Sequence, residues 1–203
     1  MGERALMWCG KIEPFVLGDN FLDLGGGDGR TAKMLFKRLK QKGGGVGVHV
    51  ADVLDYPDRV KGLPYTRITG AKTPFRNNQF DTVFLVTVLH HVGSKISDPV
   101  KLLDESVRIT KKRLVIIESV YLDEKERLYT MWIDWFYNRV LHFSKNPAEK
   151  VNVPFNFRKP KDWEKLFKKR GMRVKNSIDM KIFQILNPEH HWLFVLEPRK
   201  QHE

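Results

Sequence analysis

A glycine-rich turn between a predicted strand and a predicted helix constrains this chain more than any other feature. Residues 20–24 (NFLDL) are predicted to form the strand, and residues 31–42 a helix whose apolar side chains recur at helical spacing. The turn between them contains DLGGGDG at residues 23–29. Glycines let a backbone turn tightly and come close to a ligand, and ligands of open α/β sheets bind at the carboxyl ends of the strands. The turn is therefore the first candidate binding site.

Two common phosphate-binding motifs do not fit this turn. The dinucleotide motif G-x-G-x-x-G would need a glycine at position 30, where the chain has Arg30. The P-loop pattern G-x-x-x-x-G-K-[ST] does not occur in the sequence. What remains is an acidic residue, Asp23, followed by G-x-G-x-G.

Short β-branched runs alternate with helix-period segments along the rest of the chain, as in βαβ units around a parallel sheet. The last two predicted strands are joined by a short linker, which favours an antiparallel pair. We therefore predict an α/β, Rossmann-like fold in one domain of residues 1–203: an open, mostly parallel seven-stranded sheet with an antiparallel edge strand and helices on both faces. Further strands are expected at 46–50, 65–68, 80–89, 113–120, 172–178 and 191–196, and further helices at 98–109, 123–143 and 161–170.

Two segments carry a family resemblance. FLDLGGGDG at residues 21–29 resembles the nucleotide-binding loop of class I S-adenosylmethionine-dependent methyltransferases. PFRNNQFDTVFLVTVLHHV at residues 74–92 resembles the fourth-strand segment of their small "type 11" subgroup. The resemblance extends over about residues 19–120 and implies a methyltransferase with S-adenosylmethionine as its cofactor.

The resemblance also implies which residues contact the cofactor. Asp23 and the glycines after it would hold the methionine end. At the tip of the second strand, where the family has an acid for the ribose, the aligned residue is His49, and Asp52 follows three residues later. Losing such a charge-assisted hydrogen bond costs ~1.5–3 kcal/mol. The implied contacts are Asp23, Gly25, Gly26, Gly27, His49, Val50, Asp52, Thr69, Gly70 and Thr87, with Thr69 standing where the family has an acid for the adenine.

Candidate catalytic residues follow the fourth and fifth predicted strands. Methyl transfer needs an acceptor held in line and, for many acceptors, removal of a proton. His90 and His91 at the end of the fourth strand, and Glu118 at the end of the fifth, would lie at the same edge of the sheet. His91 is the favoured base or positioning group, although a purely structural role for either histidine is equally compatible with the sequence.

Residues 123–157 are expected to form an aromatic helical insert that covers the substrate. The alternative is that its aromatic side chains are ordinary core. The candidate pocket residues are Trp132, Trp135, Asn138, Arg139, Phe155 and Asn156.

Several chemistries are disfavoured. The Asn/Asp-Pro-Pro-aromatic segment of nucleic-acid amino methyltransferases is replaced by Thr87-Val88-Leu89-His90, and Cys9 precedes the first strand, where it cannot serve C5-pyrimidine methylation. His190 and His191 would point to opposite faces of a strand, so we predict no metal there.

The charge of the chain favours anionic partners. The net charge is +12, and residues 158–175 contain nine basic and two acidic residues. Such a field attracts polyanions, although it is also compatible with a soluble, lysine-rich surface. The leading hypothesis is a methyltransferase acting on an O or N acceptor of a small molecule. The alternatives are an RNA-directed methyltransferase and a cofactor-fold binding protein without catalysis.

The location and assembly of the protein are less constrained. No apolar run reaches the ~18 residues that a membrane span needs, and the N-terminal residues have no apolar signal core. We expect a cytoplasmic protein that does not bind membranes, and the sequence does not determine its oligomeric state.

Overall fold

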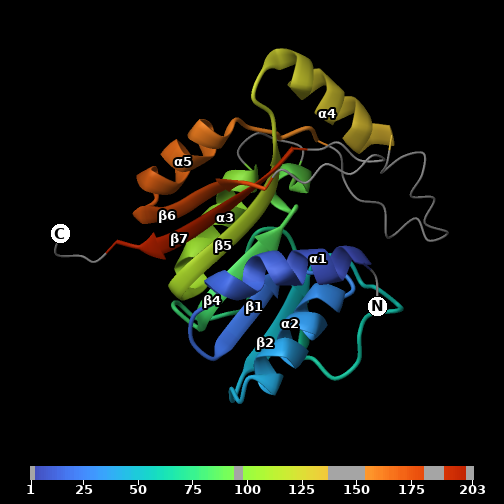
Figure 1. The fold of residues 1–203 in the computed structure, drawn as a ribbon, viewed down its shortest axis with the longest axis vertical. Coiled ribbons are helices and arrows are strands. Elements are labelled where there is room, and N and C mark those ends of the chain that lie inside the picture. The colour runs from blue at the N-terminus through green and yellow to red at the C-terminus, as the bar shows by residue number, and fades with distance from the viewer. Residues whose placement is uncertain (1–2, 94–97, 137–153, 181–189, 200–203) are drawn as a thin grey trace.

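The computed structural model describes residues 3–93, 98–136, 154–180 and 190–199, and one seven-stranded sheet organises them (Figure 1). The strand order is β3-β2-β1-β4-β5-β7-β6. The strands are β1 (Asn20–Leu24), β2 (Gly47–Asp52), β3 (Tyr65–Arg67), β4 (Phe80–Val86), β5 (Thr110–Val120), β6 (Met172–Asp179) and β7 (His190–Pro198).

The pairing confirms the predicted fold class. Parallel pairs join β3, β2, β1, β4 and β5, while β7 runs antiparallel to both β5 and β6. The reversed strand β7 therefore lies between β5 and the edge strand β6. The predicted antiparallel pairing of the last two strands is also confirmed.

Helices cover both faces of the sheet. The α-helices are α1 (Glu3–Ile12), α2 (Arg30–Gln41), α3 (Asp98–Ile109), α4 (Glu124–Phe136) and α5 (Pro160–Lys169), and the 3-10 helices are η1 (Glu13–Phe15) and η2 (Leu89–His91). Side chains of α1 and α2 share one core cluster with β1, β2 and β4. Side chains of α3 and α5 form the cluster on the opposite face. No helix in the described part of the chain has the length and apolar character needed to cross a membrane.

Helix α1 was not predicted. It buries Ala5, Trp8, Cys9 and Ile12 on one face, and this i, i+3, i+4, i+7 spacing is the signal that could have revealed it. Helix α4 begins near its predicted start, and the predicted continuation to residue 143 lies outside the described residues.

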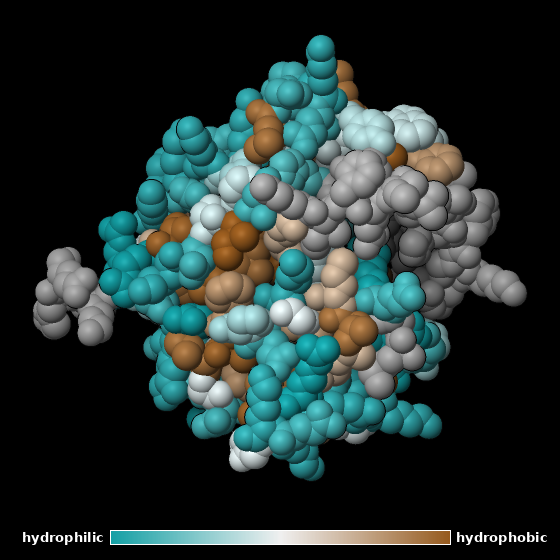
Figure 2. Space-filling model, in the orientation of Figure 1, coloured by the Kyte–Doolittle hydropathy of each residue, from teal (hydrophilic) through white to brown (hydrophobic). Residues whose placement is uncertain are grey.

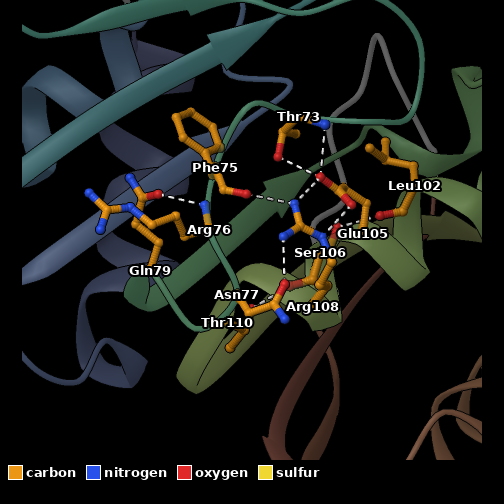
Figure 3. Close-up of polar contacts among 10 residues, drawn as sticks. All are labelled: Thr73, Phe75, Arg76, Asn77, Gln79, Leu102, Glu105, Ser106, Arg108 and Thr110. Carbon is orange, nitrogen blue, oxygen red and sulfur yellow. Dashed lines mark hydrogen bonds and ion pairs between the residues drawn. The ribbon is translucent and has the colours of Figure 1, made fainter.

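Polar contacts fasten the segment before β4 to α3 (Figure 3). Arg108 donates to the Phe75 carbonyl at 2.8 Å and to Glu105 at 2.6 Å, and Glu105 also accepts from the Thr73 N–H at 2.7 Å. The Arg108 guanidinium, with these hydrogen bonds, lowers the pKa of Glu105 to about 2. The network fixes the loop that leads into β4.

Helix α4 is attached to the two antiparallel strands through His190. The Nδ1 atom of His190 lies 2.8 Å from Glu126 of α4, and its Nε2 lies 2.8 Å from Asp179 of β6. Burial lowers the pKa of His190, but the two carboxylates outweigh it and the net pKa is raised. A protonated His190 therefore links α4 to the sheet.

This link predicts a pH-dependent stability. A raised folded-state pKa adds stability that is complete below the unfolded value and is lost as pH rises through the folded value. Because the group is partly exposed, we expect the free energy of unfolding to fall by at most ~1 kcal/mol from about pH 6 to about pH 8. Denaturant titrations of the wild type and of His190→Gln at both pH values measure it. If the free energy of unfolding of His190→Gln falls between the two pH values as much as that of the wild type, the assignment is wrong.

Candidate active site

The glycine loop after β1 is held against the end of β2. The Gly25 N–H donates to the Ala51 carbonyl at 2.7 Å, and the Gly27 N–H donates to the Asp52 carboxylate at 2.8 Å. Asp52 also accepts from the Leu54 N–H at 2.9 Å. The loop is thereby fixed at the carboxyl edge of the sheet, where the sequence predicted a binding site.

Gly25 requires the absence of a side chain for two reasons. Its φ is +78°, and an added Cβ would lie 2.6 Å from the Val88 side chain, which follows β4. This close approach brings the glycine loop against the segment that carries the two candidate histidines.

Comparison of Gly25 with Gly43 predicts how much the close approach matters. Gly43 has a similar φ of +86° but no atom within 4 Å of an added Cβ. Gly43→Ala is expected to cost ~1–2 kcal/mol through backbone strain alone. Gly25→Ala should lower the free energy of unfolding by ~1–3 kcal/mol more, because its added methyl group would clash with the Val88 side chain. Guanidinium unfolding of both variants measures the difference, and equal losses would exclude tight packing at Gly25.

Two buried carboxylates, those of Asp23 and Asp52, lie at the glycine loop. Asp23 is 2% exposed, and its Oδ2 has no hydrogen-bond partner in the described structure. Burial, then the charges of Asp52 and Asp28, raises the pKa of Asp23 well above its usual value. Burial also raises the pKa of Asp52. An ammonium group would satisfy the orphaned oxygen and restore the charged form of Asp23. The site therefore fits the amino end of S-adenosylmethionine.

The acid at the tip of β2 is Asp52, three residues beyond His49, which is the position aligned with the family's ribose acid. Strand β2 continues to Asp52, whereas His49 stands in mid-strand opposite Leu22. The His49 Nε2 atom lies 2.8 Å from the Thr66 hydroxyl, and its ring packs edge-on against Phe75. His49 is thus a partner of neighbouring core residues, away from the end of the strand.

The remaining predicted cofactor residues differ in exposure. Val50 is buried and packs beneath Gly26 and Gly29. Thr69 and Gly70 are exposed just beyond β3, where Thr69 forms an isolated bridge with Lys72.

The fourth strand ends at Val86, three residues earlier than predicted, and a single carboxylate explains the change. Thr87 has a φ of +54°, which turns the chain out of the strand. Glu118 of β5 then accepts hydrogen bonds from the N–H groups of Val88 at 3.0 Å and Leu89 at 2.7 Å. His90 and His91 consequently lie in η2, which begins three residues beyond the end of the strand.

His90 and Glu118 form a buried pair. The Nδ1 atom of His90 lies 2.6 Å from Glu118 Oε2, and both side chains are almost completely buried. Burial lowers the pKa of His90 and raises that of Glu118. The His90 ring stacks on Phe157 with centroids 4.9 Å apart. Its orientation is therefore fixed on two sides.

His91 and Asp134 complete a cluster that sequence analysis did not group. Donor atoms of His90, His91 and Asp134 all lie within 4.8 Å of one another. Asp134, on α4, is 2% exposed, while His91 is half-buried. No spacing rule relates residues 90, 91 and 134, so only the fold reveals the cluster.

A cavity of about 220 Å³ is linked to this cluster through Phe157, and none of His90, His91 and Asp134 lines it. Phe155 and Asn156 line it as predicted, and Phe157 lines it while stacking on His90. The other lining residues are Tyr121, Arg127, Arg158 and Asp162.

Trp132 and Trp135 do not line this cavity. They are exposed at 54% and 45%. Figure 2 shows teal, pale and brown side chains side by side on the surface over α4. The Trp132 ring stacks on Phe136. Asn138 and Arg139 lie outside the described residues.

Comparisons with known proteins agree with the fold and the loop. Residues 22–117 match the family model of a methyltransferase domain. A S-adenosylmethionine-dependent methyltransferase from Aquifex aeolicus is 18% identical, with 96% of this chain and 87% of that chain covered and a TM-score of 0.56. No curated protein sequence matches the chain closely enough to count as a relative.

Two further solved structures share the fold. A putative methyltransferase from Haloferax volcanii, in complex with the Trm112 methyltransferase activator, matches at 16% identity, 97% and 89% coverage and a TM-score of 0.65. Magnesium protoporphyrin IX methyltransferase from Synechocystis, with bound S-adenosylhomocysteine, matches at 12% identity, 97% and 82% coverage and a TM-score of 0.63.

The match over residues 22–117 bears out the resemblance to class I S-adenosylmethionine-dependent methyltransferases of the type 11 subgroup. It indicates S-adenosylmethionine as the cofactor.

Proposed function

We propose that this protein transfers the methyl group of S-adenosylmethionine to an O or N acceptor of a small molecule bound beneath α4. One observation carries the proposal. The glycine loop touches Val88, the next residues include His90, which pairs with Glu118, and Phe157 both stacks on His90 and lines the cavity. A cofactor on the loop and an acceptor in the cavity would therefore meet at the histidines.

The residues of the glycine loop and those at the ends of the neighbouring strands have distinct proposed roles in cofactor binding. Asp23 would receive the amino group of the cofactor, and Asp52 the ribose hydroxyls. The backbone of Gly25–Gly27 lets the cofactor approach without a Cβ in the way. Gly70 and Thr87 remain predicted contacts, and the chain has no acid at Thr69 for the adenine amine. The cofactor supplies an electrophilic methyl group on a sulfonium.

The segment Leu89–His91 activates the acceptor in this proposal. His91 is the less buried of the two rings, and we assign to it the promotion of proton loss from the acceptor. His90, held by Glu118 and Phe157, is a positioning residue.

The cavity suits a small acceptor. Its volume of about 220 Å³ is below the ~300–1,000 Å³ of typical ligand pockets, and aromatic rings and cations line it together. Tyr121 lies beneath both Arg127 and Lys159, with cation–ring distances of 5.9 and 5.7 Å. Trp132 and Trp135 lie outside the lining of this cavity, whereas Asn138 and Arg139, outside the described residues, stay predicted substrate contacts.

An RNA substrate is the second candidate because α5 borders the cavity through Asp162 and exposes lysines. The exposed lysines are Lys161, Lys165, Lys168 and Lys169. A polyanion bound there would lose affinity steeply with added salt. Asp52 at the end of β2 would supply one of the two acids whose absence motivated the non-catalytic alternative, and this speaks against that alternative.

An acceptor screen tests the proposal. Purified protein is incubated with S-adenosylmethionine and either pooled small phenols, hydroxy acids and amines or RNA, at low and moderate salt, and S-adenosylhomocysteine is quantified. Turnover with a small acceptor that salt barely changes is expected. Turnover with RNA alone, suppressed by salt, would replace the small-molecule proposal with the RNA-directed one.

A further inference from the structure

The cluster of His90, His91 and Asp134 has the donor atoms of a transition-metal site. Imidazole nitrogens and a carboxylate oxygen are preferred ligands of Zn²⁺ and of similar divalent ions. The donor atoms lie within 4.8 Å of one another. Tetrahedral bonds of ~2.1 Å put ligand atoms ~3.4 Å apart, so closure by at most ~1.4 Å would form the site.

We propose that His90, His91 and Asp134 bind one divalent transition-metal ion, for which Zn²⁺ is the natural occupant. Three protein ligands leave at least one coordination position open, as catalytic zinc sites do. A strictly oxygen-seeking ion such as Mg²⁺ is disfavoured, since two of the three donors are nitrogens.

The surroundings of His90 match those of a metal-binding histidine. Such a histidine usually donates its second ring N–H to a carboxylate, which fixes the tautomer and the ring orientation. Glu118 lies 2.6 Å from Nδ1 and is itself held by two backbone N–H groups. With Nδ1–H donating to Glu118, Nε2 is the nitrogen left for the ion. Stacking on Phe157 holds the ring in place.

The role of the ion rests on the proposed function and narrows it to an oxygen acceptor. Coordination to the ion lowers the pKa of an acceptor hydroxyl, so that its proton passes to solvent near neutral pH. The acceptor oxygen then forms a bond to the methyl carbon as the sulfur–carbon bond breaks, and that electron pair stays on sulfur. His91 thus promotes proton loss as a ligand of the ion.

Metal binding is tested without cofactor or acceptor. Chelator-treated full-length protein is titrated with Co²⁺, followed by its visible d–d absorption, and Zn²⁺ is then added to displace it. We expect one Co²⁺ per chain, displaced by Zn²⁺ and not by Mg²⁺. His91→Ala and Asp134→Asn should each weaken binding at least ~10-fold, and Glu118→Gln ~10–100-fold. Circular dichroism confirms that each variant is folded.

Matched controls separate this site from general histidine or aspartate binding. His49 contacts Thr66 in β3, and the exposed Asp104 of α3 pairs with Arg170, so His49→Gln and Asp104→Asn should keep wild-type Co²⁺ affinity. Absence of saturable binding, or binding that His91→Ala and Asp134→Asn leave intact, overturns the proposal. A protein that binds S-adenosylmethionine and turns over in chelator, without binding Co²⁺, retains the proposed function and loses only the metal site. Co²⁺ binding at the cluster without cofactor binding supports the metal site and contradicts the proposed function.

Discussion

Replacing Asp52 by alanine is expected to weaken S-adenosylmethionine binding by about 100-fold or more. A carboxylate that accepts both ribose hydroxyls makes two charge-assisted hydrogen bonds, each contributing ~1.5–3 kcal/mol, and ~1.4 kcal/mol changes affinity tenfold. The same side chain accepts from the Gly27 and Leu54 N–H groups, so its loss also loosens the loop. Isothermal titration calorimetry of the wild type and the variant measures the ratio of dissociation constants.

His49→Gln is the matched control for this prediction. Glutamine can keep the hydrogen bond to Thr66, and the position lies in mid-strand, so cofactor affinity should match the wild type. If His49→Gln weakened binding as much as Asp52→Ala, the placement of the ribose acid at Asp52 would be wrong.

His91→Ala is expected to lower kcat by ~10²–10⁴ while the dissociation constant of S-adenosylmethionine stays unchanged. Activation of the acceptor is needed in the transition state and contributes little to holding the cofactor. His91 lies on η2, whereas the predicted cofactor acids lie at the ends of β1 and β2. Steady-state rates with an acceptor from the screen, beside calorimetry with the cofactor, measure both quantities.

The split between rate and affinity decides the role of His91. A merely structural histidine would lower kcat and cofactor affinity together, or lower neither. Glu118→Gln should reproduce a weaker form of the His91 effect, because Glu118 acts on the cluster through His90.

Sequence patterns predicted most of the sheet because each strand is marked by its own residues. Phe80 to Val86 is almost entirely apolar, as a strand covered on both faces must be, and β4 does lie between β1 and β5. The end of that strand was misjudged, since the apolar run continues through Leu89. The strand ends because Glu118 of β5 accepts hydrogen bonds from the Val88 and Leu89 N–H groups. A contact between residues 30 positions apart leaves no local signal.

Part of the candidate site was likewise predictable from the local sequence, and part of it depends on contacts between distant residues. The glycine loop was predicted because its glycines are needed locally, as the positive φ of Gly25 and Gly27 shows. Strand β2 extends two residues beyond its predicted end, to Asp52, and this placement is why we propose Asp52 rather than His49 as the ribose acid. Asp134 was missed because its approach to His90 and His91 depends on how α4 packs over the sheet.

Calorimetric titration of the protein with S-adenosylmethionine and with S-adenosylhomocysteine tests the central claim most directly. The buried acids Asp23 and Asp52 at the glycine loop predict one site per chain with micromolar affinity for both compounds. No heat of binding with either compound up to millimolar concentration would contradict the assignment of this loop as the cofactor site.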